Sequence, residues 1–184
     1  MQSVILDETS FVAKMDELME IYQRAFVLPD NERLSILERF ERHRKRQDFK
    51  AVLAVGDDGK ALGFCYGYKG YPGEWWHDQV RSRMSIDMAA SWMNSSFELA
   101  EVAIDPNAQG RGIGGILMEK LLMDVDATTA LLCVRVNNSN ALSLYNKQGW
   151  NTLIEEMSFP SEELGYAIMG KRLAHVGNQP RPTA

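Results

Sequence analysis

The segment from residue 97 to residue 125 restricts the fold of this chain more than any other. An extended apolar run ends at Asp105-Pro106, a glycine-rich loop follows, and apolar residues then return at helical spacing. Proline has no amide hydrogen for a strand ladder, so the strand ends there. Glycine lets a backbone turn tightly and approach a ligand closely, and here it occupies four positions: Gly110, Gly112, Gly114 and Gly115. The segment therefore predicts strand, loop and helix, with the free amides of a helix N-terminus gathered into an anion site.

Two common phosphate-binding loops do not account for this segment. A Walker loop needs Gly-Lys-Ser/Thr after its second glycine, which is absent here. A dinucleotide loop needs G-x-G-x-x-G and an acidic residue about 20 positions later. Gly110, Gly112 and Gly115 have that spacing, but Asp126 follows Gly115 by only eleven residues. The loop also lies past the middle of the chain, where a nucleotide-binding fold would begin late.

Hydrophobic periodicity and turn residues predict the remaining elements. Helical patterns cover 11–26, 30–46, 113–124 and 140–148, with a weaker one over 79–93. Extended patterns cover 4–6, 50–55, 61–68, 97–104, 130–136, 150–154 and 163–170. The turn at residues 56–59 predicts a hairpin between its two flanks. Strand, helix, strand and helix in succession predict an α/β fold in which two adjacent parallel strands are joined by a right-handed crossover.

Length and composition predict one globular domain. The 184 residues suit a single domain, which we expect over 1–176, with a polar tail over 177–184. Apolar residues make up 45% and charged residues 24%, values that exclude disordered, collagen-like and disulfide-rich classes. The longest apolar runs hold five residues, far fewer than the roughly 20 of a membrane helix. The N-terminus lacks a secretory pattern, so we expect a cytoplasmic protein without membrane partners.

The net charge and the spacing of cysteine and histidine residues exclude further classes of function. A net charge of −5 opposes nucleic acid as a partner and suits a cationic substrate. The basic run at 39–46 is interpreted as a solvated helix face, because it lacks interleaved aromatic residues. Cys65 and Cys133 form no CxxC pair, and the three histidines share no ligand spacing, so no metal is expected.

The loop and its surroundings resemble a known family. Gln109-x-x-Gly112-x-Gly114 has the Q/R-x-x-G-x-G/A signature of the GNAT superfamily of N-acetyltransferases. Residues 98–106 look like that family's fourth strand, 137–150 like its following strand–helix–strand, and 165–173 like its last strand. The similarity covers residues 1–173 and is strongest from 97 to 150.

This resemblance implies a central mixed, twisted sheet flanked by helices, with splayed fourth and fifth strands and acetyl-CoA between them. It implies direct acetyl transfer to a primary amine, without a metal or a covalent enzyme intermediate. Asn140 would hold the cofactor arm or cap its helix. The expected cofactor contacts are Val102, Ala103, Ile104, Gln109, Gly110, Arg111, Gly112, Ile113, Gly114, Asn140 and Tyr145.

The parity of apolar residues in the strand before the loop predicts a β-bulge. Leu99 is odd-numbered, whereas Val102 and Ile104 are even-numbered, so an unbroken strand could not place all three on one face. A bulge near residues 100–101 reconciles them. Bulges splay strands beside active sites, and the family carries one at this place.

Two residues are the expected catalytic groups. An ammonium must lose a proton before it attacks, and a partly buried carboxylate is a suitable base. The resemblance favours Glu98 as that base, while Glu101, His77 and water stay as alternatives. In the family, the residue matching Tyr145 protonates the departing thiolate; a core position is the alternative for this tyrosine.

Residues 71–96 are the expected acceptor pocket. This long, weakly periodic segment directly precedes the strand of Glu98 and is rich in tryptophan and methionine. Aromatic faces attract cations, so Trp75 and Trp76, with Glu98 at the edge, predict a small cationic or amphipathic amine. Core packing is the alternative for both rings.

Two other functions remain open. The same fold could bind acyl-CoA as a sensor without turning it over, or acetylate peptides or proteins. Thiol release from acetyl-CoA over a panel of amines separates the enzyme from the sensor. A monomer and a homodimer are both compatible with the sequence.

Overall fold

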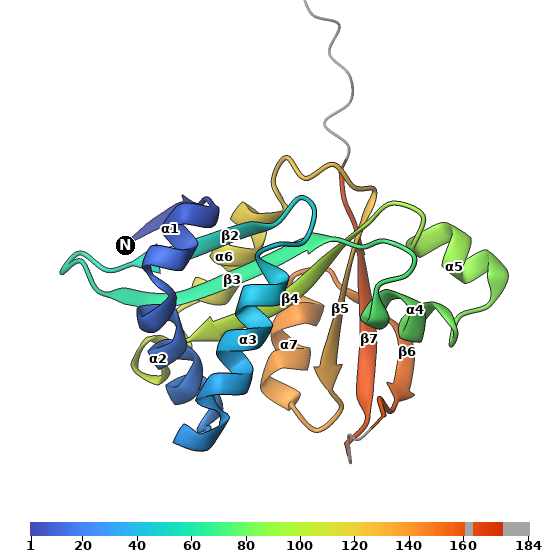
Figure 1. Cartoon of the computed structure of the whole chain (residues 1–184). Coiled ribbons are helices and arrows are strands. Elements are labelled where there is room, and N and C mark those ends of the chain that lie inside the picture. The colour runs from blue at the N-terminus through green and yellow to red at the C-terminus, as the bar shows by residue number, and fades with distance from the viewer. Residues whose placement is uncertain (161–163, 175–184) are drawn as a thin grey trace, which may run out of the picture.

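A single mixed sheet organises the chain, whose computed structural model describes residues 1–160 and 164–174. Within these residues seven strands follow the order β1-β2-β3-β4-β5-β7-β6 (Figure 1). Neighbours are antiparallel except for β4 and β5, which are parallel and joined through α6 (Ile113–Leu122). The strands are β1 (Gln2–Leu6), β2 (Lys50–Val55), β3 (Ala61–Lys69), β4 (Ser96–Ile104), β5 (Thr129–Arg135), β6 (Asn151–Met157) and β7 (Tyr166–Arg172).

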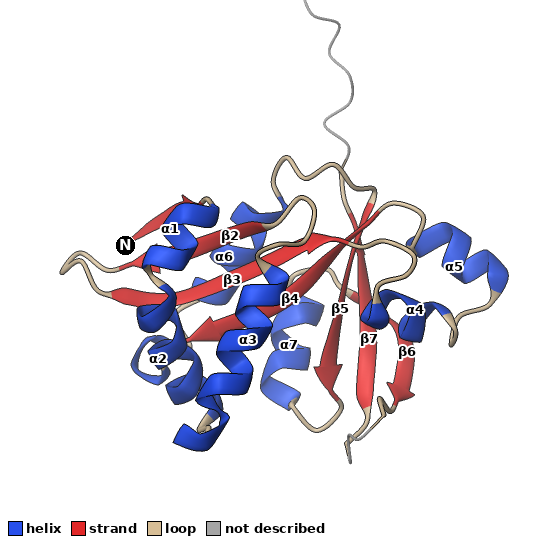
Figure 2. Ribbon diagram, viewed as in Figure 1, coloured by secondary structure: helices blue, strands red, loops and turns tan. Residues whose placement is uncertain are grey.

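Helices cover both faces of the sheet (Figure 2). On one face, α1 (Glu8–Ala13), α2 (Met15–Phe26) and α3 (Arg33–His43) pack on β2 to β4, and α4 (Trp75–Arg81) and α5 (Ile86–Trp92) pack on β5 to β7. On the other face, α6 and α7 (Ser139–Lys147) share a core with residues of β2 to β5 and β7. Two 3-10 turns complete the fold, η1 (Asp30–Glu32) and η2 (Pro106–Ala108).

The alternation of side chains along each strand builds these two layers of core. Leu131 of β5 packs in the cluster beneath α4 and α5, whereas its neighbour Leu132 packs in the cluster beneath α6. Phe11, Leu18 and Phe40 bring the first three helices onto the sheet as fully buried anchors. Both faces of the sheet are thus covered, as parallel α/β arrangements require.

The predicted hairpin and crossover are confirmed, but two predicted helices are each divided. β2 and β3 pair antiparallel around the turn that contains Gly59 at φ +79°. The helix expected over 11–26 is interrupted at Lys14, whose φ of −103° and ψ of 5° leave the helical region. The helix expected over 79–93 is instead α4 and α5. Ser85 begins α5 by accepting a hydrogen bond from the Met88 amide at 3.2 Å.

The C-terminal predictions are met only in part. β7 runs to Arg172, two residues further than expected, because each residue from Thr129 to Arg135 of β5 offers it a pairing partner. Residue 163, the expected start of that strand, and the expected tail at 177–184 lie outside the described residues. Within the described part of the chain, no helix is long and apolar enough to cross a bilayer.

The predicted splay between β4 and β5 is present. Only three residue pairs join these strands, the last of them Glu98 with Leu131, and then the strands diverge (Figure 1). Between β3 and β4 the register steps from Gly67↔Leu99 to Tyr66↔Glu101, which leaves Ala100 as an extra residue. This is the predicted bulge. It allows Leu99, Val102 and Ile104 of β4 to share the α6 face.

Candidate active site

A loop at the end of β4 presents backbone amides at the open end of the splay. Gln109 is held at its entrance, because its Nε2 donates to the Ile104 carbonyl at 3.1 Å. Gly110 and Gly112 adopt φ values of +74° and +76°, which residues with a Cβ rarely adopt. α6 begins directly after, and its first amides have no acceptor within the helix. The predicted order of strand, loop and helix is confirmed, and phosphate binding by the loop amides stays a prediction.

The four glycines of this loop divide into two functions. A Cβ at Gly110 or Gly112 would meet no atom within 4 Å. A Cβ at Gly114 would lie 3.2 Å from Leu144 of α7, and one at Gly115 would lie 2.5 Å from Gln148. Gly114 and Gly115 thus also leave room for the Leu144 and Gln148 side chains, and close approach of a ligand to the loop glycines stays a prediction. The amide of Gly114 remains a predicted phosphate donor.

Tyr145 of α7 approaches the gap from the α6 face of the sheet. Its ring packs against the core cluster of that face, 6.0 Å from the Trp150 ring. Burial, followed by the charges of Cys133 and Glu101, raises the pKa of its hydroxyl well above the usual range. The ring therefore lies against the core that Leu99 of β4 and Val134 of β5 share with α6, and its hydroxyl carries its proton at neutral pH.

Asn140 is an exposed residue of the first turn of α7. The cap of this helix is instead Asn138, whose side chain accepts from the Ala141 amide at 3.1 Å. The capping role predicted as one alternative for Asn140 is thus wrong, and its contact with the cofactor stays a prediction. Arg111, also an expected cofactor contact, is exposed in the loop.

Glu98 lies on the opposite face of the sheet, at the last pair before β4 and β5 separate. The residue is only 3% exposed, and its Oε1 is buried without a hydrogen-bond partner among the described residues. Burial raises the pKa of this carboxyl to about 8, while the positive charge of Arg46 acts against the rise. A carboxyl with this pKa and a free oxygen is suited to accept a proton near neutral pH.

Glu101 has a different environment on the same strand. Its carboxylate lies 3.3 Å from a guanidinium nitrogen of Arg39, and Tyr22 donates a hydrogen bond to it. Arg39 also donates to the Tyr22 hydroxyl at 2.8 Å. Burial raises the pKa of Glu101, and these two partners lower it. Since its oxygens are engaged, Glu101 is less available as a base than Glu98.

The third candidate base, His77, is 1% exposed on α4. Neither ring nitrogen has a hydrogen-bond partner among the described residues, although Nδ1 lies 3.5 Å from Asp78. Glu98 is equally closed to solvent, so burial does not separate these two candidates. Glu98 lies in the last pair before β4 and β5 separate, whereas His77 lies on α4, and this position favours Glu98.

The two tryptophans of the expected acceptor pocket have different surroundings. Trp75 is 56% exposed, and its ring packs 5.5 Å from the Phe159 ring. Trp76 is half-buried in the cluster beneath α4 and α5 and hydrogen-bonds to the Cys133 thiol. Trp75 is thus a surface aromatic residue, while Trp76 faces the core and β5.

The charges of neighbouring groups affect the pKa values around the separation of β4 and β5. These groups are Glu98, Glu101, Cys133 and Tyr145. Burial raises the pKa of Cys133 to about 11, to which the charges of Glu101 and Glu98 add. The same Glu101 raises the pKa of Tyr145 across the gap. Two carboxyls on one face and a hydroxyl on the other therefore flank the separation of β4 and β5. Such an arrangement can take a proton on one side and supply one on the other.

Sequence reasoning missed the basic residues that support these carboxyls. The run at 39–46 was interpreted as solvated, yet Arg39 pairs with Glu101, and Arg46 pairs with Glu74 and lies 5.8 Å over the Tyr68 ring. Arg39 lies on α3, whereas Arg46 follows the end of that helix at His43, so helical periodicity carries no signal that groups the two residues. Among the described residues, no group of His, Cys, Asp or Glu could hold a metal ion.

Comparisons with known proteins agree with this geometry. Residues 15–150 match the sequence model of the acetyltransferase (GNAT) family. The chain is 38% identical over 120 residues to a GCN5-like protein acetyltransferase of Mycobacterium tuberculosis, covering 61% of this chain and 58% of that protein. It is 38% identical over 56 residues to the ribosomal protein bS18-alanine N-acetyltransferase of Salmonella typhimurium, covering 29% and 38%. The chain thus spans less than two thirds of the length of either relative.

The fold has solved counterparts. The ribosomal-protein-S18-alanine N-acetyltransferase of Escherichia coli superposes with a TM-score of 0.61 at 20% identity. The superposition covers 97% of this chain and 98% of that one. At this identity the likeness concerns the fold, including the mixed sheet described above.

Proposed function

This chain belongs to the acetyltransferase (GNAT) family, and on that basis we propose that it transfers an acetyl group from acetyl-CoA to a primary amine. The observation that carries the proposal is the gap between β4 and β5, which has an amide-lined loop at its open end and Glu98 and Tyr145 on its two sides. A sensor that binds acyl-CoA without turnover would need neither a raised carboxyl pKa nor a phenol at this place.

The loop and the diverging strand hold the acetyl-CoA in this proposal. Amides of residues 109–114 bind its pyrophosphate, and β4 residues from Val102 to Ile104, unpaired toward β5, bind its arm. Asn140 contacts the same arm from α7. When bound, acetyl-CoA supplies the activated thioester, and the residues around the gap supply the proton transfers.

Glu98 acts as the base and Tyr145 as the acid. The deprotonated carboxylate of Glu98 takes one proton from the ammonium of the acceptor, directly or through water, which leaves a neutral amine that can attack. The Tyr145 hydroxyl, protonated at neutral pH, gives its proton to the sulfur that leaves. The two proton transfers occur on opposite faces of the sheet, so Glu98 serves the amine and Tyr145 serves acetyl-CoA.

The acceptor in this proposal is a small cationic or amphipathic amine. In its deprotonated form Glu98, which has no hydrogen-bond partner on Oε1, favours a positive charge beside the gap, and the exposed Trp75 offers an aromatic face to a cation. A protein amine is the second candidate. It is favoured by the names of the two relatives. One is a protein acetyltransferase, and the other is a ribosomal protein bS18-alanine N-acetyltransferase.

Loss of cofactor binding on substitution of Gly112 tests the loop. CoA at 100 times its Kd should stabilise the wild-type chain by about 2.7 kcal/mol. Gly112→Asp should abolish this thermal shift, because it introduces a negative charge where amides meet phosphate. Gly112→Ala is the control for the strained φ, and it should keep part of the shift. An equal shift in Gly112→Asp and wild type would remove the loop from the cofactor site.

Substitution of Trp75 tests the acceptor side. Trp75→Ala should raise KM for a cationic amine about fivefold, since a cation over an aromatic face gains roughly 1 kcal/mol, while KM for acetyl-CoA stays constant. Ile86→Ala, at an 83% exposed position of α5, is the control for general loss of surface hydrophobicity. Steady-state kinetics with a small amine and with a peptide should be compared. An effect confined to the peptide would favour the protein acceptor.

A further inference from the structure

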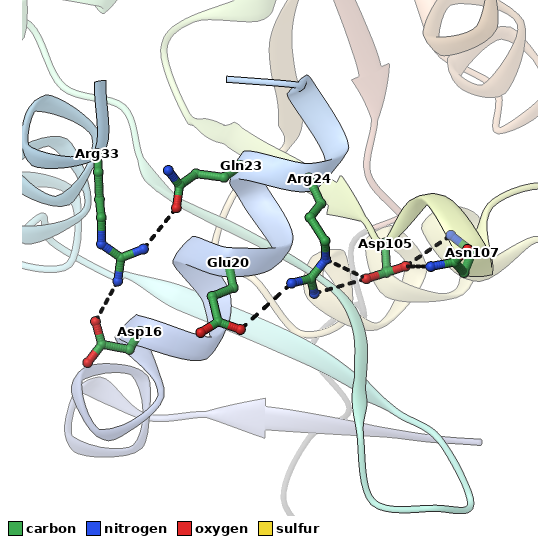
Figure 3. Close-up of polar contacts among 7 residues, drawn as sticks. All are labelled: Asp16, Glu20, Gln23, Arg24, Arg33, Asp105 and Asn107. Atoms are coloured by element: carbon green, nitrogen blue, oxygen red, sulfur yellow. Dashed lines mark hydrogen bonds and ion pairs between the residues drawn. The ribbon is translucent and has the colours of Figure 1, made fainter. Parts of the chain in front are cut away.

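Asp105 lies at the junction between β4 and the loop, and both of its carboxylate oxygens are engaged. Oδ1 accepts from the Asn107 amide at 2.9 Å and from its side chain at 3.1 Å, which fixes the turn η2. Oδ2 accepts from Arg24 of α2, from Nε at 3.0 Å and from a terminal nitrogen at 2.9 Å. Figure 3 shows this chain of contacts from α2 to the turn. One side chain thus connects the first helices to the start of the loop.

Arg24 is itself oriented by a neighbour on its helix. Glu20, one turn earlier, lies 3.7 Å from the guanidinium on the side away from Asp105. Two nitrogens of Arg24 contact the same carboxylate oxygen of Asp105. This geometry fixes the orientation of the guanidinium in addition to pairing the two charges. The contact joins residues 81 positions apart, on α2 and at the end of β4.

The loop needs such an external anchor because its own backbone is permissive. Gly110 and Gly112 follow the turn, and glycine has many accessible conformations when nothing restricts it. Packing of α6 fixes the end of the loop that leads into that helix, and η2 fixes the end that follows β4. Binding is tighter when the donors are already in position, since less conformational entropy is lost.

We propose that Arg24 is a positioning residue of the cofactor loop, which holds Asp105 and its turn so that the loop amides are in place before acetyl-CoA binds. This rests on the proposed function, because it assigns acetyl-CoA to that loop. Arg24 touches neither the gap nor its catalytic groups. Its loss should therefore affect cofactor affinity and spare the chemical step.

A purely structural role would give a different result. Arg24 is 48% exposed and Asp105 is 13% exposed, so solvent screens one side of this ion pair and its contribution to folding is modest. Arg33 is a matched control from the same helix pair (Figure 3). It bonds to Asp16 at 2.8 Å and to Gln23 at 2.9 Å, yet has no contact with the loop. If Arg24 served only to join elements, its substitution would resemble that of Arg33.

The test compares Arg24→Ala with Arg33→Ala in the full chain. Calorimetry should show the Kd for CoA raised about tenfold in Arg24→Ala, a typical coupling for groups in one network, and less than about twofold in Arg33→Ala. KM for acetyl-CoA should rise in parallel while kcat is unchanged. Without ligand, amide hydrogen exchange over residues 107–112 should quicken in Arg24→Ala only. The Tm values of the two variants should agree within about 3 °C.

Two further variants isolate the contact. Asp105→Asn keeps an acceptor for the Asn107 amide but loses the charge that faces Arg24, so it should reproduce Arg24→Ala. The double variant should then add no further loss. Arg24→Lys, which keeps the charge without the two-nitrogen geometry, should be intermediate.

The outcomes separate this inference from the proposed function. Unchanged CoA affinity in Arg24→Ala, or an equal loss in Arg33→Ala, would overturn the positioning role while wild-type binding upholds the cofactor site. A wild-type chain that binds no CoA would overturn both.

Discussion

Tyr145→Phe is expected to lower kcat by about 10²- to 10⁴-fold, the usual contribution of a positioned general acid. The substitution removes only the hydroxyl, so the ring still packs beside Trp150 in the core that α7 covers. Kd for CoA should be nearly unchanged, because the proton is needed when the thiolate leaves and not when the cofactor binds. Thiol release at saturating substrates measures kcat, and calorimetry measures the affinity.

Leu144→Ala is a suitable control for this experiment. It changes the preceding residue of α7, which also packs against the core cluster of that face, without removing a proton donor. It should lower Tm more than Tyr145→Phe and kcat much less. A change in kcat below about threefold in Tyr145→Phe, with chemistry shown to limit the rate, would return Tyr145 to a packing role.

Glu98→Gln should lower kcat/KM by about 10²-fold or more and remove the acidic limb of its pH profile. The base is active when deprotonated, and burial raises the pKa of this carboxyl to about 8. Wild-type kcat/KM should therefore rise with pH and level off above that value. The variant has no titrating group at this place, so its residual rate should lack this limb. Rates measured from pH 6 to 10 with a fixed amine test it.

Glu101→Gln is the matched control on the same strand. It should leave the limb in place and lower Tm, because the partly buried guanidinium of Arg39 would lose its charged partner. If Glu101→Gln removed the limb and Glu98→Gln kept it, the roles of the two carboxyls would be exchanged. A limb present in both variants would leave His77 or water as the base.

The pH dependence of stability is a second, independent test of the Glu98→Gln variant. The folded chain binds this proton up to about pH 8, whereas an ordinary glutamate loses it near 4.5. The folded state therefore holds more protons than the unfolded state between these values, and stability falls as pH rises through the window. Glu98→Gln should remove this fall, so its Tm relative to wild type should be higher at pH 9 than at pH 5.

Local sequence patterns determined much of this protein without any tertiary information. Strand, loop and helix around Gly112 follow from proline, glycine and apolar spacing within a few residues of one another. The bulge at Ala100 follows from the parity of Leu99 and Val102, because side chains alternate strictly along a strand. The breaks at Lys14 and Ser85 were missed, since the apolar stripe continues across both and periodicity alone carries no signal for a short interruption.

The tertiary structure alone decided which of the chemically similar groups are engaged by neighbours and which are not. Glu98 and Glu101 are the same residue type on one strand, yet Arg39 and Tyr22 arrive from α3 and α2 to engage only Glu101. Trp75 and Trp76 are neighbours in the chain, yet one is exposed and the other meets Cys133 on β5. Burial and charge, which set a carboxyl's pKa and a ring's access to substrate, depend on groups that are distant in sequence. Such groups become neighbours only when the helices pack on the sheet.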